Sequence, residues 1–547
     1  MKRRVELNEL WWKSVDGPML AQFRESRRAI ALLPDRFGGY YYLDPESGEK
    51  IKITERNKDL FSLEAYCFYR PLPNTPMTGR EFVRFLLTGL QAGDVLTVII
   101  AAVASSLVGM LIPFATQYAF SSVLNTGKHY LLVSLGILLL CAAISSWLIN
   151  VVKQSVSSRI NNRLDVLCEN AVYSRVIRLP APFFRGKSAG ALASKILALN
   201  GVPAVITELL FGVFLTVIVS VIYIIQIAGI AGPLAGPVFV IYIVEILLFI
   251  LTVLQERKLM QDRLSAEEDN SAMVFGLLSG VQKIKVSGSE KRAYAKWMQA
   301  YSKRTRTTYR ILFPASVRAP LMTAVHMLGM LWIYMIGYQN GISVSRFVAF
   351  SSAFGLAMAG INALSASGTS FSIIKPILDL GEVILKAVPE ETEGKRIITD
   401  LNGYIRLEHV TFRYSEDTPA VLDDISLQID PGEYVAVVGS SGCGKSTLLK
   451  LLLGFEEPQQ GIIFYDNFDI GSIDKNSLRR NIGTVLQDGK LFAGDIYSNI
   501  TITAPWMSMD DAWNAAEKAG MAQDIRNMPM GMHTMITEGS GGISGGQ

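Results

Sequence analysis

The chain has 547 residues, of which 50% are hydrophobic and 18% are charged, with a mean hydropathy of +0.30 and a formal net charge of +4. This length allows several domains, and the apolar balance is too high for an ordinary soluble enzyme. The small positive charge comes from basic loops between apolar stretches, so it does not indicate a nucleic-acid partner. The four cysteines are scattered without the spacing of a zinc site or a disulfide framework.

The first 90 residues predict a small cytoplasmic α+β domain. Tyr40–Leu43 and Lys50–Thr54 alternate like the two strands of a hairpin around a polar turn. After a proline-rich connector, Thr78 and Glu81 have the spacing of a capping box that opens a helix leading to the membrane. This segment has one cysteine and no histidine, so it cannot host a Cys/His nucleophilic pair.

Apolar stretches between Val95 and Ile374 are long enough to cross a membrane, which takes about 20 residues per helix. One of them, Leu209–Val244, is too long for a single span and is broken by glycines and prolines, so it predicts a helical hairpin. A very large soluble helical core is the alternative interpretation. We expect six spans, near residues 95–119, 130–152, 203–227, 234–255, 319–339 and 347–370.

The basic residues predict the orientation of these spans. The loop Lys153–Gly201 carries eight Lys or Arg and the loop Arg257–Arg310 carries twelve, whereas the short loops between the other spans carry almost none. Lys and Arg accumulate on the cytoplasmic side, so both long loops and both termini are expected in the cytoplasm. The long loops are also expected to extend the membrane helices, because 154–176 and 259–275 contain no proline.

A glycine-rich loop, Gly439–Thr447 (GSSGCGKST), follows the apolar run Tyr434–Val438, which we expect to be a buried parallel strand. In such a loop, glycines let backbone N–H groups wrap phosphates, Lys445 reaches the β- and γ-phosphates, and the Ser446 hydroxyl holds Mg²⁺. The sequence therefore predicts ATP and Mg²⁺ as ligands. The residues expected to contact the nucleotide here are Gly439, Ser440, Ser441, Gly442, Cys443, Gly444, Lys445, Ser446 and Thr447.

With further motifs in the same order, the chain resembles the exporter type of the ABC transporter superfamily. Tyr414 stands where the family has an aromatic ring that stacks on adenine, although a strand tyrosine is more often structural. Gln487 matches the family's glutamine loop, which implies contacts with Mg²⁺ and the attacking water and, with Lys445, a catalytic role. The last residues resemble the family's signature sequence, which closes over ATP held by the opposite subunit: Ser544, Gly545, Gly546 and Gln547.

The resemblance implies a half-transporter that dimerises, as a homodimer or a heterodimer, to form its ATP sites. Segments 178–196 and 276–297 are similar to the two cytoplasmic coupling regions of exporters. The implied organisation is an N-terminal domain without peptidase residues, a transmembrane domain of six helices, a linker and an ATP-binding domain with a P-loop α/β fold. Their expected bounds are 1–90, 91–380, 381–403 and 404–547.

Segments 11–20 and 65–85 look like the permease and ATP-binding subunit of bacteriocin exporters whose substrates carry nitrile-hydratase-like leader peptides. This narrower resemblance implies ATP-driven export of a leader-bearing peptide across the bacterial inner membrane, with a peptidase-bearing chain as a possible partner. Export of lipids or drugs is the alternative within transport, because the membrane helices carry no substrate code. Glu245 and His326 lie inside expected spans, where each either faces the pathway or pairs within the bundle.

The family places a strand ending in Asp-Glu and a later histidine beyond the signature, and the given residues contain none of these. Phosphoryl transfer depends on positioning water and stabilising charge, so the 547 residues alone are expected to hydrolyse ATP hardly at all. We therefore expect the sequence to be a fragment of a working ATPase. A catalytically silent subunit that binds nucleotide and completes a heterodimer is the other interpretation.

Overall fold

A computed structural model gives the structure of the chain. It describes every residue except 1, 8–10, 13–16, 36–38, 46, 124–125, 127–128, 310–312, 391–393, 486–490, 505 and 537–547. The chain folds as two compact units, Met1–Glu391 and Thr392–Gln547. The division falls inside the expected linker 381–403, of which residues 381–386 belong to helix α15 (Gly368–Lys386).

The first unit begins with an antiparallel sheet in the strand order β1-β6-β2-β3-β4-β5. The expected hairpin is confirmed, since Tyr42 pairs with Ile51 and Leu43 with Lys50. One face of the sheet is covered by an aromatic core that includes Trp11. The strands are β1 (Lys2–Glu6), β2 (Met19–Phe23), β3 (Ala29–Pro34), β4 (Tyr40–Leu43), β5 (Lys50–Lys52) and β6 (Phe61–Phe68), with a 3-10 turn η1 (Lys58–Leu60) before β6.

Helix α1 (Gly79–Leu87) begins where the capping box predicts. The Thr78 side chain accepts a hydrogen bond from the Glu81 backbone N–H, and the Glu81 carboxylate accepts one from the Thr78 backbone N–H. Two backbone N–H groups at the start of the helix, which have no carbonyl partner within it, are thereby hydrogen-bonded. Phe82 and Leu86, four residues apart on one face of α1, are fully buried, so the helix is held by its packing.

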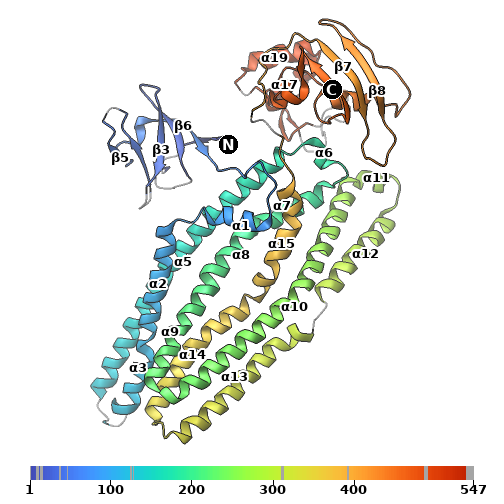
Figure 1. Cartoon of the computed structure of the whole chain (residues 1–547). Helices are drawn as coiled ribbons and strands as arrows, with labels where there is room; N and C mark the ends of the chain where they lie inside the picture. The colour runs from blue at the N-terminus through green and yellow to red at the C-terminus, as the bar shows by residue number, and fades with distance from the viewer. Residues whose placement is uncertain are drawn as a thin grey trace. The chain divides into compact units, whose positions relative to one another are not determined.

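Six helices of the described residues are long and apolar enough to cross a membrane, which confirms the expected number. Figure 1 shows these helices running side by side as an elongated bundle. The helical segments are α2 (Ala92–Gly109), α3 (Leu111–Tyr118), η2 (Ala119–Val123), α5 (His129–Ile177), α6 (Ala181–Phe184), α7 (Ala189–Asn200), α8 (Val202–Thr207), η3 (Glu208–Phe214), α9 (Leu215–Ile230), α10 (Gly232–Ser279), α11 (Val281–Val286), α12 (Glu290–Thr308), α13 (Phe313–Gln339), α14 (Val344–Ala366) and α15.

Small residues let the membrane helices approach one another. Ala349, Ala353 and Ala357 repeat every four residues along α14, and all three are fully buried. They belong to a core shared by α9, α10, α13 and α14. Side chains this small bring helix backbones close, which favours packing where the surrounding solvent is itself apolar.

The two polar residues noted inside expected spans both lie against the bundle. Glu245 on α10 is 4% exposed, so its carboxyl group faces protein and not lipid. The His326 ring on α13 lies 5.2 Å from the ring of Phe354. Neither side chain therefore stands alone on the outer surface.

Helices α5 and α10 extend beyond their apolar parts, as expected, and ion pairs hold their polar parts in place. Asp94 at the start of α2 is buried and pairs with both Arg159 and Arg163 of α5. Lys303 of α12 lies 2.7 Å from the Asp269 carboxylate of α10. These polar extensions therefore form part of the same bundle as the membrane spans.

The second unit contains an antiparallel sheet in the order β10-β9-β7-β8. Helix α16 (Lys445–Leu452) contributes Leu448 and Leu451 to the core that covers this sheet. The remaining elements are β7 (Ile405–Phe412), β8 (Leu422–Ile429), β9 (Gln460–Tyr465), β10 (Phe468–Asp469), η4 (Ile470–Ser472), α17 (Lys475–Arg480), β11 (Gly494–Asp495), α18 (Ile496–Ile500), α19 (Met509–Lys518), α20 (Ala522–Arg526), η5 (Gly531–His533) and β12 (Met535–Ile536).

The expectation of a buried parallel strand at Tyr434–Val438 is wrong. These residues form no strand, and Tyr434 and Val438 are 94% and 88% exposed. A strand needs a neighbour for its N–H and C=O groups, and no described strand pairs with this run. Apolar character alone therefore does not bury the segment.

A glycine controls the approach of β9 to β7. Gly461 has φ +83°, and a Cβ atom there would lie 2.3 Å from the carbonyl oxygens of both Glu408 and His409. Both the left-handed backbone and the close approach therefore require glycine.

Replacing Gly461 with alanine should destabilise the second unit by about 3 kcal/mol or more, because the clash adds to the left-handed strain. Gly432→Ala is the matched control, since Gly432 also has positive φ but has open space around it, and it should cost about 1 kcal/mol. Pulse proteolysis of the purified chain in urea, following fragments of residues 392–547, measures both. Equal urea midpoints for the two variants would contradict the assignment.

Candidate functional site

The backbone of the glycine-rich loop turns sharply just before helix α16, because its glycines adopt positive φ values. Gly442 and Gly444 have φ +87° and +101°, values that L side chains rarely adopt, and Gly439 lies at the edge of that region with φ +159°. A Cβ at Gly444 would also lie 2.9 Å from Leu422 of β8, so the loop is packed against the sheet. Loops with successive glycines of positive φ bind anions through their backbone N–H groups, so Gly439–Gly444 is named the anion cradle.

Lys445, the first residue of α16, bends back over this cradle. Its ammonium group donates to the carbonyl oxygens of Gly439 at 2.9 Å and Ser440 at 2.8 Å and lies 3.7 Å from the Cys443 sulfur. A cation is thus held at the mouth of the loop, where the positive end of the helix dipole also lies. The loop fits a chain of phosphates, because its backbone and its one ammonium group both favour anions.

The neighbouring hydroxyl groups have different environments. Ser446 is exposed beside the loop, whereas Thr447 is 5% exposed and points into the unit. The Thr447 hydroxyl is 3.0 Å from the Tyr414 hydroxyl. Ser446 is therefore the accessible hydroxyl of the two, as a metal ligand must be.

Tyr414 lies beside the start of α16, where its hydroxyl meets that of Thr447 although 33 positions separate the two residues in the chain. Its ring is 38% exposed and meets the Phe412 ring edge-on at a centroid distance of 5.0 Å. The Lys450 ammonium lies 5.9 Å from the Tyr414 ring centroid. An exposed aromatic face next to the cradle is compatible with base stacking, which stays a prediction.

The other predicted site residues lie outside the described part of the chain: Gln487, Ser544, Gly545, Gly546 and Gln547. The structure consequently brings together Tyr414 and Gly439–Thr447 from the predicted set. Ser440 and Ser441 are exposed loop residues in that group.

Sequence reasoning did not single out the pair Asp495–His533, which ties β11 to the turn before β12. The Asp495 carboxylate caps α18 by accepting from the Ser498 backbone N–H at 2.8 Å, and it lies 2.9 Å from His533 Nδ1. Hydrogen bonds from Ser498 and then from His533 lower the pKa of Asp495 to about 2. The capping spacing of Asp495 and Ser498 was a usable signal, but the contact with His533 was not.

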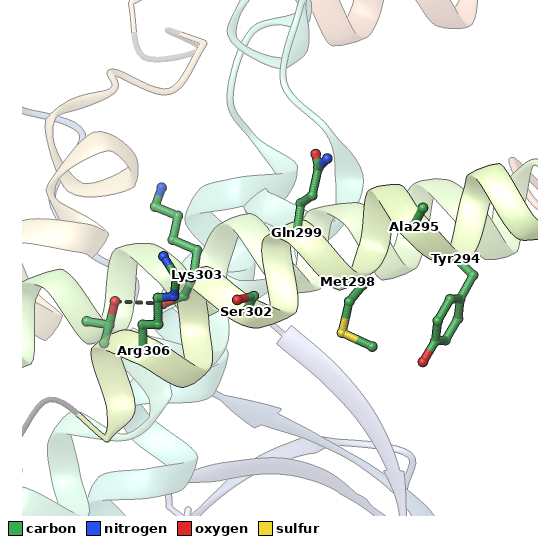
Figure 2. A pocket seen from close by; sticks show the side chains of 8 residues that line it. Tyr294, Ala295, Met298, Gln299, Ser302, Lys303 and Arg306 are labelled. Carbon is green, nitrogen blue, oxygen red and sulfur yellow. Dashed lines mark hydrogen bonds between the residues drawn. The ribbon is translucent and has the colours of Figure 1, made fainter.

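Among the described residues of the first unit, two hollows stand out. Figure 2 shows the larger, about 760 Å³, as an open face of α12 lined by residues of that helix alone, Tyr294 to Thr307. The smaller, about 250 Å³, lies between α5 and the stretch α8–η3, and Lys153 and Glu208 bring opposite charges to it. The first is a helix surface and not an enclosed site, whereas the second is a polar recess within the bundle.

The comparisons with known proteins match both units. Residues 95–360 match the family described as ABC transporter transmembrane region, and residues 422–547 match the family described as ABC transporter. The cyclolysin secretion/processing ATP-binding protein CyaB of Bordetella pertussis is 27% identical over 95% of this chain and 75% of its own length.

Two further relatives have related names. The exotoxin translocation ATP-binding protein PaxB of Pasteurella aerogenes is 26% identical over 82% of this chain and 64% of its own length. The leukotoxin translocation ATP-binding protein LktB of Mannheimia haemolytica is 27% identical over 72% of this chain, which spans 56% of that relative. A solved structure of a bacterial Atm1-family ABC exporter with ATP bound matches with a TM-score of 0.74 at 21% identity, over 85% of this chain and 82% of that one.

Replacing Lys445 with alanine should weaken ATP binding about 10- to 100-fold, because charge-assisted hydrogen bonds to phosphate are lost. Lys518→Ala is the control, since Lys518 is an exposed lysine of the same unit, in the last turn of α19, with no contact to the described site residues. Displacement of a fluorescent ATP analogue from the purified chain measures both affinities. An equal loss in the two variants would show only a general effect of positive charge.

The low pKa of Asp495 predicts that the stability of the region 494–536 depends on pH. A folded-state pKa of about 2, below the ordinary value of about 3.9, adds stability above about pH 4 that is lost as the pH falls towards 2. Pepsin cleavage within 494–536 should accelerate over that window. Asp495→Asn, which keeps a cap acceptor but cannot ionise, should flatten the difference, and an unchanged pH profile in this variant would contradict the account.

Proposed function

Because this chain is a half-transporter of the ABC exporter family, we propose that it moves a leader-bearing polypeptide out of the cytoplasm across a bacterial inner membrane. It does so as one half of a dimer, homomeric or paired with a peptidase-bearing chain, with both termini in the cytoplasm. The observation that carries the proposal is the agreement among relatives named for secretion or translocation of protein toxins. A bacteriocin-like peptide is the finer choice, from the resemblance of segments 11–20 and 65–85.

The residues of the phosphate loop have distinct roles in this proposal. Lys445 and the loop N–H groups would bind the phosphates of ATP, and the exposed Ser446 hydroxyl, with Gln487, would hold Mg²⁺. Tyr414 orients the base by stacking. Bound Mg²⁺ neutralises charge that develops on the phosphates during hydrolysis.

Closure of two ATP-binding domains supplies the movement that opens the pathway. Ser544–Gln547 of each subunit would contact the nucleotide held by the other, which makes the dimer the functional unit. The polar extensions of α5 and α10 carry that movement into the bundle, because a continuous helix transmits displacement along its axis.

The bundle offers polar groups to a polypeptide in transit. Glu208 lies on the π-helical stretch η3, where its carboxylate accepts a hydrogen bond from the Ser370 hydroxyl at 2.7 Å, next to the recess that Lys153 also lines. π-helical stretches are frequent at functional sites. Glu208 is exposed beside this recess, whereas Glu245 on α10 is buried in the bundle. Such groups suit the peptide bonds and charged side chains of a polypeptide better than lipid tails.

The test is the ATPase rate of the intact protein in lipid nanodiscs. A leader-bearing peptide should raise the rate about twofold or more, because substrate binding favours the closed dimer, whereas added lipids or a hydrophobic drug should leave it unchanged. Lys445→Ala, which weakens ATP binding and removes the cation beside the phosphates, should abolish the rate in every condition. Stimulation by lipid or drug alone would overturn the polypeptide assignment, and a wild-type protein with no ATPase activity under any condition would favour a silent subunit.

A further inference from the structure

Arg175, in the last turn of α5, is a buried cation that is surrounded by backbone carbonyl groups. Its side chain is 0% exposed, and its hydrogen-bond partners among the described residues are five backbone carbonyl oxygens and no carboxylate. A buried charge is costly unless polar groups replace its water shell. The five carbonyl groups do so here, which means that the surrounding chain must keep their positions.

Those carbonyls come from two segments far apart in sequence. Nη1 donates to Pro73 O at 2.6 Å, and Nη2 donates to Thr75 O at 2.9 Å, both in the connector between the N-terminal sheet and α1. Nε donates to Ile384 O at 3.2 Å, and Nη2 also reaches Leu385 O at 2.7 Å. The last two carbonyls belong to the final turn of α15, where the helix dipole is negative and a cation is stabilised.

Further contacts join the same segments. Met77 N–H donates to Leu385 O at 2.9 Å, which links the connector directly to the end of α15. Arg178, one turn after Arg175, accepts at its backbone oxygen from Glu390 N–H at 2.9 Å and donates to the Asn74 side chain at 3.3 Å. An apolar core that includes residues of the connector, α1, α5, α7 and α15 surrounds the junction.

Close packing makes this junction stiff. A Cβ at Gly79, the first residue of α1, would lie 3.0 Å from Leu378 of α15. A Cβ at Gly381 of α15 would lie 2.3 Å from Leu199 of α7. Helices in such contact cannot shift independently, since interiors transmit displacement and do not absorb it.

The segments that meet at Arg175 lead to three parts of the chain. The connector leads back to the N-terminal sheet, α5 leads on to the first coupling region, 178–196, and α15 leads to the residues that enter the ATP-binding unit. We propose that Arg175 is a positioning residue that couples the N-terminal domain to the nucleotide-driven movement of α5 and α15. This goes beyond the proposed export and does not depend on the identity of the substrate.

Only arginine has the donor geometry to bind the carbonyl groups of both segments at once. A guanidinium group has five N–H donors in a planar fork, whereas a lysine ammonium has three donors around a point charge. Lysine can keep the charge but cannot reach carbonyls of both segments in the same way. Coupling is reciprocal by linkage, so a ligand that moves the connector must also alter the affinity for nucleotide.

The first test uses the wild-type chain in nanodiscs and amide hydrogen exchange with and without Mg²⁺ and ATP. Exchange in residues 72–78 and 384–390 should slow together by about threefold or more when ATP binds. Residues 439–450 report nucleotide binding itself. If 439–450 responds and 72–78 does not, the inference is wrong while ATP binding stands. If 439–450 does not respond, it is the ATP-driven function that fails.

The second test compares Arg175→Gln and Arg175→Lys with Arg159→Gln as the matched control. Arg159 lies on the same helix, but its side chain is 56% exposed and pairs with Asp94. In Arg175→Gln the ATP response of 72–78 should vanish while that of 439–450 remains, and Arg175→Lys should lose part of it. Arg159→Gln should keep both responses.

A purely structural role predicts a different pattern. Both 72–78 and 384–390 would then exchange faster without nucleotide, yet 72–78 would still respond to ATP in the variants. That result would overturn the proposal. If Arg175→Gln does not fold, the wild-type measurement and the charge-retaining Arg175→Lys variant still decide the question.

Discussion

A hydrocarbon layer has no water to pair with backbone N–H and C=O groups, so a chain that crosses it must satisfy these groups within its own helices. The membrane spans are therefore continuous helices, and two of them continue well beyond the membrane. Helices α5 and α10 have 49 and 48 residues, which corresponds to about 73 and 72 Å, against a hydrocarbon thickness of about 30 Å. The internal hydrogen bonds that let these helices cross the membrane also make them stiff, so they can transmit movement along their length.

Movement reaches the rest of the bundle only if the ends of these helices are held, and a buried polar junction holds the end of α5. Arg175, in the last turn of α5, binds carbonyls at the end of α15. In the separate ATP-binding unit, Lys445 and the glycines of the loop form the anion cradle. The covalent chain that joins the two units therefore connects the phosphate loop in one unit to the helix ends in the other.

Local signals in the sequence predicted the features that depend on neighbouring residues. The six spans, the β4–β5 hairpin and the capping box at Thr78 all follow from short-range patterns. Features that depend on distant partners could not be predicted. Tyr434–Val438 has strand-like residues but no described partner strand, and Arg175 counted only as one basic residue of a cytoplasmic loop. Its role emerges only when residues about 100 and 210 positions away meet it.

We propose that ATP drives a polypeptide through this bundle, and a transport assay measures this movement itself. Inverted inner-membrane vesicles containing the intact protein would be mixed with a fluorescent leader-bearing peptide, and protease-protected peptide would be measured over time. Peptide should accumulate inside the vesicles only with ATP, and not at all with the Lys445→Ala protein. Equal accumulation without ATP, or with that variant, would contradict it.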